Sequence, residues 1–255
     1  MKRTVKTVYL GIVYLFLYLP LAVLTIYSFN DAKHVVTWKG FTTRWYAKLA
    51  ENTVLLDAAV NSLLLAAASA TTAAIIGTLA AIALKRYRFT GRTILSTSMY
   101  VVMMSPDIVM GISLLMLFVM LGLPLGFTTL FLSHVTFCLP FVTVTVLARL
   151  TGLDANLVEA AMDLGAREYD VFSRIILPLA MPGVLAGWLL SFTLSLDDVI
   201  ISFFVTGPTF DILPLKIYSM VRLGVKPEVN ALCAVMFCVT LVVVFVTHFC
   251  LKERK

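Results

Sequence analysis

The sequence predicts an all-α membrane protein with six transmembrane helices. The chain is 60% hydrophobic and only 13% charged, whereas soluble domains carry about 25% charged residues. Six apolar runs each provide the roughly 20 residues that a helix needs to cross a bilayer. Lipid offers no partner to backbone N–H and C=O groups, so each run is expected to be helical.

The six runs follow one another without a domain boundary, and we therefore expect a single transmembrane domain over residues 1–255. The first run follows Met1-Lys2-Arg3, as in a signal peptide, but its length indicates an uncleaved span. The predicted spans, in chain order, are 8–28, 58–84, 94–121, 127–148, 182–205 and 230–251.

Lys and Arg are divided unequally between the two sides of these spans. Thirteen lie in the two terminal tails, in the link after the second span and in the loop after the fourth, and seven lie on the opposite side. The side richer in Lys and Arg faces the cytoplasm, so both termini are expected there. This topology accounts for the net charge of +6, and no nucleic-acid partner is expected. Among the outer segments, 206–230 is expected to hold a short helix over 215–223.

Three carboxylates, Asp107, Asp197 and Asp198, interrupt otherwise apolar spans. An Asp near the middle of a membrane helix costs about 2.5–3.5 kcal/mol, so such residues usually face a protein interior or a watery cavity. The third and fifth spans run in the same direction, which brings the three acids to similar depth, bordering one cavity. A capping role is the alternative for each acid, and which of Asp197 and Asp198 faces the cavity stays open.

Aromatic side chains near these acids are candidates to line the same path, because ring faces attract cations. The candidates are Tyr100, Trp188 and Phe192, together with Phe203 and Phe204.

One polar stretch, 154–177, is too charged to span a bilayer. Asp154 is expected to cap a helix that ends near Leu164, and Gly165 permits the sharp turn that follows. A second helix is expected from Arg167 to Ile175. Pro178 and Pro182 are expected to break that helix and to begin the fifth span.

The first helix of this loop has a narrow apolar stripe at helical spacing, formed by Leu157, Ala160, Ala161 and Leu164. The stripe alone fits two alternatives equally well. It could enter a groove of a cytoplasmic partner, or it could fold back against the chain's own helices.

The loop resembles the cytoplasmic loop of permeases from ABC importers, through E-A-A-x-x-x-G at 159–165 and I-x-L-P at 175–178. Blocks at 102–110, 134–141 and 190–198 resemble permeases of the bacterial spermidine/putrescine importers. The resemblance implies a type I ABC importer permease fold in the bacterial inner membrane. It also implies a coupling helix that enters a cleft on an ATPase, formed by Glu159, Ala160, Ala161, Leu164 and Gly165.

The same resemblance implies partners and a mechanism. The partners are a second homologous permease subunit, two copies of an ABC ATPase, a periplasmic substrate-binding protein and membrane lipid. The chain lacks the G-x-x-x-x-G-K-[ST] phosphate loop, so no cofactor is expected in it, and ATP and Mg are expected on the partner ATPase. Polyamines would cross by alternating access that the ATPase drives.

Two other kinds of transporter remain as alternatives. Permeases for another small solute, such as ferric iron, share the coupling loop. A stand-alone secondary transporter or channel fits the spans and the buried acids, and only the loop argues against it.

Neither an enzyme nor a metal site is expected. No Ser-His-Asp order is present, and neither the cysteines nor the histidines have metal-ligand spacing. His134 is expected to be a polar group that packs between helices. The residues considered were His34, His134, His248, Cys138, Cys233, Cys238 and Cys250.

Overall fold

The computed structural model describes residues 2–32, 37–154, 156–223 and 227–252. His34 lies outside these ranges, and the side chains of His248 and Cys250 are likewise outside the described part. Within it every regular element is a helix, apart from one isolated β-bridge between Asn30 and Phe41, so the all-α prediction is confirmed. The elements are α1 (Lys2–Tyr27), α2 (Arg44–Glu51), α3 (Thr53–Arg86), α4 (Arg92–Met104), α5 (Asp107–Met120), α6 (Phe127–Thr151), α7 (Asn156–Asp163), α8 (Glu168–Val171), a π-helical turn (Phe172–Ile176), α9 (Leu177–Asp197), α10 (Ile200–Val205), α11 (Leu213–Leu223) and α12 (Pro227–Lys252).

Four helical stretches in the described residues are long and apolar enough to cross a membrane. A fifth is present if α4 and α5 together form one broken span, and α12 contributes a shorter apolar stretch, Pro227–Val242. The short helix expected over 215–223 is present as part of α11. The four long stretches are Val5–Tyr27, Thr53–Arg86, Phe127–Thr151 and Glu168–Asp197.

The prediction of one continuous helix over 94–121 is wrong. The helix breaks at Ser105-Pro106, and the direction of the chain bends by 114° between α4 and α5. Pro106 has no N–H to donate, and a residue before proline is pushed towards extended backbone, which Ser105 adopts with ψ 136°. Asp107 therefore lies in the first turn of α5, rather than in the middle of a helix.

The predicted span over 182–205 also needs correction at both ends. The helix does not start at Pro182, because α8, the π turn and α9 form one continuous helix from Glu168 to Asp197. Nor does it continue to residue 205, because it stops at Asp197, and α10 begins after Asp198-Val199. We call Asp198-Val199 the α9–α10 break.

Pro178 and Pro182, expected to interrupt the chain, lie inside the continuous helix. In an ordinary α-helix the ring of Pro178 would meet the carbonyl four residues earlier. The π turn ends at Ile176, two residues before Pro178, and the Leu177 N–H bonds the Phe172 carbonyl, five residues back. This wider winding gives the ring room and lets the helix continue.

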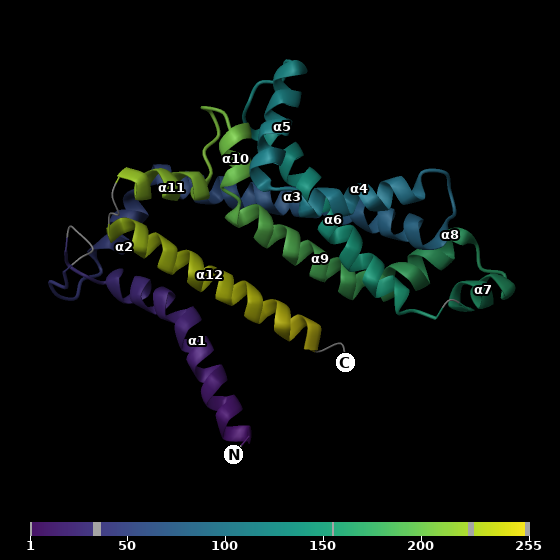
Figure 1. Ribbon diagram of the computed structural model, residues 1–255, viewed down its shortest axis with the longest axis horizontal. Helices are drawn as coiled ribbons and strands as arrows, with labels where there is room; N and C mark the ends of the chain where they lie inside the picture. Colours follow the sequence, from purple (N-terminus) through teal and green to yellow (C-terminus); the bar gives the residue numbers. More distant parts are fainter. Residues whose placement is uncertain (1, 33–36, 155, 224–226, 253–255) are drawn as a thin grey trace. The chain divides into compact units, whose positions relative to one another are not determined.

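The chain divides into two compact units, which are described separately. Unit 1 comprises Met1–Asp57 and Lys216–Lys255, and unit 2 comprises Ala58–Leu215. In unit 1, α12 packs against α1 and α2 (Figure 1). Asn30 organises its loop: its side-chain amide donates to Thr37 O at 2.8 Å, and its backbone carbonyl accepts the buried Trp45 indole N–H at 2.8 Å.

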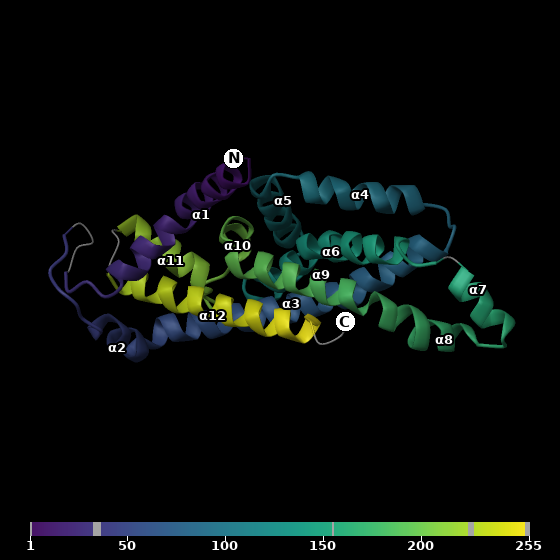
Figure 2. The same cartoon turned by 90° about the horizontal axis from the view of Figure 1, so that it is seen from below.

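Unit 2 is built on the pairing of α6 with α9, which run side by side in both views (Figures 1 and 2). Val142 lies fully buried at the centre of this pairing. A Cβ added to Gly187 of α9 would lie 3.2 Å from the Val142 Cα, and one added to Gly77 of α3 would lie 2.9 Å from the Val142 Cβ. Glycines thus let three helices approach closely around one valine.

The shorter helices α5 and α10 form a second close pair in unit 2, beside the α9–α10 break (Figure 1). Gly111 of α5 lies at their contact. A Cβ added there would lie 2.7 Å from Phe204 Cδ2 and 3.3 Å from the Ile201 Cα. This pair positions the first turns of both helices.

We therefore expect Gly111→Val to destabilise the protein by about 1–3 kcal/mol, because the added side chain overpacks the α5–α10 contact. The measurement is the midpoint of thermal unfolding in detergent. Gly11→Val is the matched control, since a Cβ at Gly11 would have nothing within 4 Å. Equal unfolding midpoints for the two variants would contradict this account of the contact.

Candidate functional site

A cavity of about 460 Å³ lies at the junction of α4, α5, α6 and the α9–α10 break. It brings Asp107 together with the adjacent Asp197 and Asp198, although Asp107 and Asp197 are 90 residues apart in the sequence. We call it the acid cavity. Its lining residues are Val102, Met103, Ser105, Asp107, Met110, Phe137, Phe141, Leu194, Asp197, Asp198, Val199, Ile200 and Ile201.

Asp107 and Asp197 reach this cavity from the ends of two helices. Asp107 is in the first turn of α5, and Asp197 is the last residue of α9. Both residues are exposed. A carboxylate in a first helical turn is favoured by the partial positive charge of the unpaired N–H groups there. The break at Pro106 therefore explains how an apolar segment tolerates Asp107.

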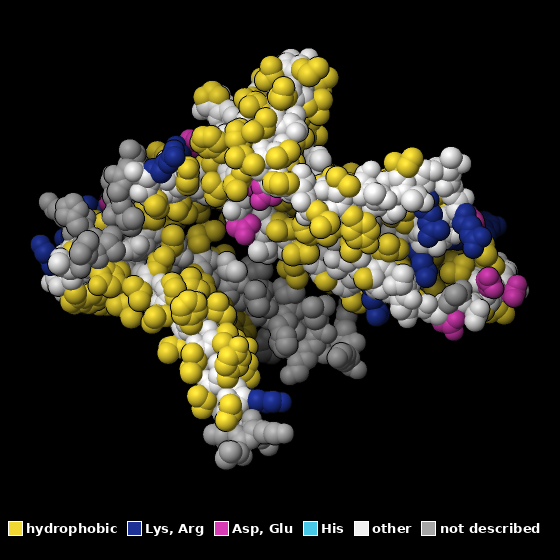
Figure 3. Space-filling model, in the orientation of Figure 1, with side chains coloured by type: hydrophobic (Ala, Val, Ile, Leu, Met, Phe, Trp, Pro, Cys, Tyr) yellow, Lys and Arg dark blue, Asp and Glu magenta, His cyan; other side chains and the backbone are white. Residues whose placement is uncertain are grey.

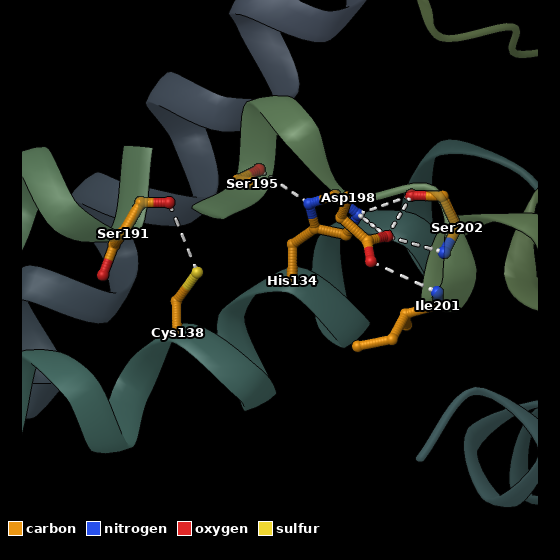
Figure 4. A network of polar contacts seen from close by, with 7 residues as sticks. All are labelled: His134, Cys138, Ser191, Ser195, Asp198, Ile201 and Ser202. Carbon is orange, nitrogen blue, oxygen red and sulfur yellow. Dashed lines mark hydrogen bonds and ion pairs between the residues drawn. The ribbon is translucent and has the colours of Figure 1, made fainter. Parts of the chain in front are cut away.

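Asp198 has a different environment, because its carboxylate is bonded to the start of α10 (Figure 4). Oδ1 accepts the N–H of Ile201 at 3.2 Å, and Oδ2 accepts the N–H of Ser202 at 2.8 Å. The Ser202 hydroxyl donates to the same Oδ2 at 2.7 Å. The side chain is only 8% exposed. Asp198 thus satisfies backbone groups that the α9–α10 break would leave without partners.

His134 of α6 joins both sides of the α9–α10 break (Figure 4). Its ring is fully buried, with Nδ1 2.6 Å from Ser195 Oγ on α9 and Nε2 3.0 Å from Ser202 Oγ on α10. The Nε2 atom is 3.7 Å from Asp198 Oδ2. We call His134, Ser195, Asp198 and Ser202 the His134 network. The expected packing role of His134 is confirmed, and the network also involves one of the predicted acids.

None of the five aromatic candidates lines the acid cavity. Trp188 stacks on Phe192 with ring centroids 5.2 Å apart, and its indole N–H donates to Thr71 Oγ1 at 3.0 Å. Tyr100 is exposed on α4. Their place on a substrate path stays a prediction.

The polar loop folds as predicted around α7 and Gly165. Asp154 Oδ1 accepts the N–H of Asn156 at 2.9 Å at the start of the helix. At its end Gly165 adopts φ +83°. The N–H of Gly165 bonds Met162 O at 2.9 Å and the N–H of Ala166 bonds Ala161 O at 3.0 Å. This is the Schellman arrangement, which needs a left-handed residue and favours glycine.

The apolar stripe of α7 is divided between two surroundings. Ala161 and Val158 pack against the buried core of unit 2. Leu157 and Ala160 are exposed, and Leu164 is 90% exposed. The stripe therefore does not form one surface, because the helix turns Ala161 towards its own chain. Its outer part remains free for a partner within the described structure.

One ion pair connects this loop to α3, and a second lies within the loop. Arg86, at the end of α3, lies 3.2 Å from Glu168 at the start of α8, and Arg174 lies 3.3 Å from Asp170. Basic side chains gather at the end of α3 and the start of α4 (Figure 3), namely Lys85, Arg86, Arg88 and Arg92. They line a cleft of about 660 Å³ together with Leu157, Glu159 and other residues of the loop.

The hydroxyl partners of His134 were not predicted from the sequence. A histidine in an apolar span indicates a buried hydrogen-bonding group, but nothing local indicates which of the many serines it meets. The one pattern in the sequence that bears on these partners is the four-residue spacing of Ser191 and Ser195, which places both serines on one face of α9.

Comparison with known sequences and structures gives concordant results. The family described as "Binding-protein-dependent transport system inner membrane component" matches residues 73–252. The spermidine/putrescine transport system permease protein PotC of Escherichia coli (strain K12) is 54% identical over 252 residues, covering 99% of this chain and 96% of that protein. The putrescine transport system permease protein PotI of the same strain is 43% identical, covering 94% of this chain and 88% of that protein.

A chain from the crystal structure of a bacterial ABC transporter that imports the acidic polysaccharide alginate has a similar fold. The TM-score is 0.76 at 17% sequence identity, and the match covers 98% of this chain and 95% of that one. At this identity the likeness concerns the fold alone.

The geometry of Gly165 gives a prediction for the loop. We expect Gly165→Val to weaken the turn after α7 by about 1–2 kcal/mol, because a side chain disfavours the left-handed conformation. Tryptic cleavage after Arg167 should then become about 5- to 30-fold faster, since cleavage follows the population of opened loop. Gly152→Ala is the control, because Gly152 has φ −82° and tolerates a side chain. Unchanged cleavage in Gly165→Val would contradict the prediction.

Proposed function

The chain belongs to the family of inner membrane components of binding-protein-dependent transport systems, and from this premise we propose that it is a polyamine-importing ABC permease subunit. It makes and breaks no covalent bond. Its role is to line the substrate path and to transmit movement from a separate ATPase. The observation that carries the proposal is the continuous helix that starts at the polar loop and ends at the acid cavity.

We propose six membrane crossings with both termini in the cytoplasm, in a single transmembrane domain. The four long apolar stretches support four of these crossings. The bent pair α4 and α5 would be the third crossing and α12 the sixth. The excess of Lys and Arg on one side of these spans supports the orientation. The polar loop then lies in the cytoplasm.

The proposed partners are a second homologous permease subunit, two copies of an ABC ATPase and a periplasmic binding protein. Glu159, Ala160 and Leu164 would dock α7 into a cleft on the ATPase, with Ala161 and Gly165 fixing the helix on its own chain. The high exposure of Leu164 supports this docking, because burying a leucine side chain contributes about 1.5–3 kcal/mol. ATP and Mg would be bound by the ATPase, and this chain would bind neither.

Movement of α7 would reach the acid cavity through one helix. Glu168–Asp197 is 30 residues long, which corresponds to about 45 Å at 1.5 Å per residue. Glu168 is paired with Arg86 at one end, and Asp197 borders the acid cavity at the other. A displacement of the loop would therefore shift the carboxylate that faces the path. ATP binding would open the cavity outward, and hydrolysis would reset it inward.

The proposed substrates are spermidine and putrescine. The names of two relatives, PotC and PotI, support this choice. A linear polycation that loses water needs negative charge in return, which Asp107, Asp197 and Asp198 supply around one cavity. Trp188 and Phe192 lie on α9 before Asp197 and are proposed, with Tyr100, as contacts along other parts of the path.

The decisive test is purification of the complex from native membranes, followed by uptake of radiolabelled spermidine into reconstituted vesicles. We expect uptake to require ATP and the ATPase subunit. Leu164→Asp should weaken ATPase binding by about 10- to 100-fold and so lower the amount of ATPase that copurifies, because it places a charge where the proposed complex would bury a leucine. Phe41→Ser, in the outer segment, is the control and should retain the ATPase.

Two outcomes would contradict the proposal. ATP-independent uptake, or uptake that survives deletion of 154–177, would favour a stand-alone transporter or channel. Uptake of ferric iron or another solute in place of polyamines would move the chain to a different branch of the same family.

The acids give a separate prediction. We expect Asp197→Asn and Asp198→Asn to lower spermidine uptake by roughly tenfold without preventing assembly, because each removes negative charge from the cavity where the amine loses water. The measurement is the initial rate of uptake at equal amounts of assembled complex. Asp57→Asn is the control, because Asp57 is an exposed acid that does not line the acid cavity. Wild-type rates in both cavity variants would remove the support for a charge role.

A further inference from the structure

We infer that His134 is a positioning residue, which holds the α9–α10 break so that Asp197 faces the acid cavity and Asp198 stays at the start of α10. The inference rests on the proposed function for the identity of the substrate. The hydrogen bonds of His134 are features of this chain and do not depend on that function. His134 lies on α6 and does not line the acid cavity. It would therefore act through the acids rather than by touching the substrate.

The first argument is the location of the hydrogen bonds. Ser195 is in the last turn of α9 and Ser202 is in the first turn of α10, so the two partners of the ring lie on opposite sides of the break. The only residues between α9 and α10 are Asp198 and Val199. The ring thus fixes both helix ends that flank the acids.

The second argument is that the protons of the network form one consistent order (Figure 4). The Ser202 hydroxyl donates to Asp198 Oδ2, so Ser202 Oγ accepts a hydrogen bond from the Nε2–H of His134. In neutral histidine Nδ1 then carries no proton and accepts from Ser195. Each member has one defined role, and Asp198 receives its orientation from His134 through Ser202.

The third argument is that a buried imidazole is costly without partners. The His134 side chain is fully buried, and a buried polar group that loses its hydrogen bonds is strongly disfavoured. A rearrangement that separates Ser195 from Ser202 would break at least one of these bonds. The network therefore favours one arrangement of the break, which a static packing contact between apolar side chains would not specify.

The experiment compares variants of His134 in the complete reconstituted transporter, by the KM for spermidine and by hydrogen exchange at the amides of Ile201 and Ser202. His134→Leu should raise the KM roughly tenfold and accelerate exchange. His134→Gln places an amide near the Nε2 position, within reach of Ser202, and should restore most of both properties. Ser202→Ala should raise the KM, and adding it to His134→Leu should cause little further change, because the two residues act through one network.

Thr129→Val is the matched control. It also removes a buried hydrogen bond between α6 and α10, from Thr129 Oγ1 to Val205 O at 2.7 Å, but at the end of α10 away from the acids. We expect its KM to remain at the wild-type value. An equal rise of KM in Thr129→Val, or a wild-type KM and exchange rate in His134→Leu, would overturn the inference.

The two proposals fail in different ways. If the wild-type complex takes up no spermidine, the proposed substrate is wrong, and the exchange measurement alone still tests His134. If the wild type transports spermidine but Gln and Leu at position 134 behave identically, the positioning role is wrong and the proposed function stands. Should His134→Leu fail to accumulate in the membrane, His134→Gln and Ser202→Ala provide the same comparison.

Discussion

A chain in lipid can interrupt a helix only where other groups satisfy the backbone N–H groups that the interruption releases. Unit 2 contains two such interruptions, at Ser105-Pro106 and at Asp198-Val199, and both lie beside the acid cavity. Proline removes one donor at the first, and the Asp198 carboxylate accepts two N–H groups at the second. The requirement to satisfy these groups explains why an acid occurs at position 198. At the first interruption α4 and α5 are bent by 114° relative to each other, and residues of both interruptions line the acid cavity.

The continuous helix Glu168–Asp197 gives the two candidate sites a physical connection. One end lies at the turn after α7 and is tied to α3 through Arg86, and the other end carries Asp197. Its middle packs against α6 through Gly183 and Gly187, which bring the two helices close together. A continuous helix with one end at the proposed docking surface and the other at the acid cavity suits a subunit that converts movement into altered substrate access.

Much of this arrangement was predictable from the sequence, because it depends on local pattern. Apolar runs located the long helices, and the spacing around Asp154 and Gly165 predicted the bounds of α7 and its turn. The three acids were identified from the cost of charge in lipid. The prolines were misleading, however: Pro106 broke a helix that the apolar run predicted as continuous, whereas Pro178 and Pro182 did not break theirs. A proline indicates that one hydrogen bond is lost, but the surrounding packing determines whether the helix bends, widens into a π turn or stops.

The sequence by itself determined the helical class, the apolar segments, the polar loop and the presence of acids within apolar segments. Only the tertiary structure decided that Asp198 is bonded to α10 while Asp197 is exposed at the cavity, and that His134 spans the break. The reason is that hydrophobicity, turn chemistry and helix periodicity act over a few residues. The partners of His134 are 61 and 68 residues away along the chain. Which serine reaches which ring nitrogen depends on how α6 packs against α9 and α10.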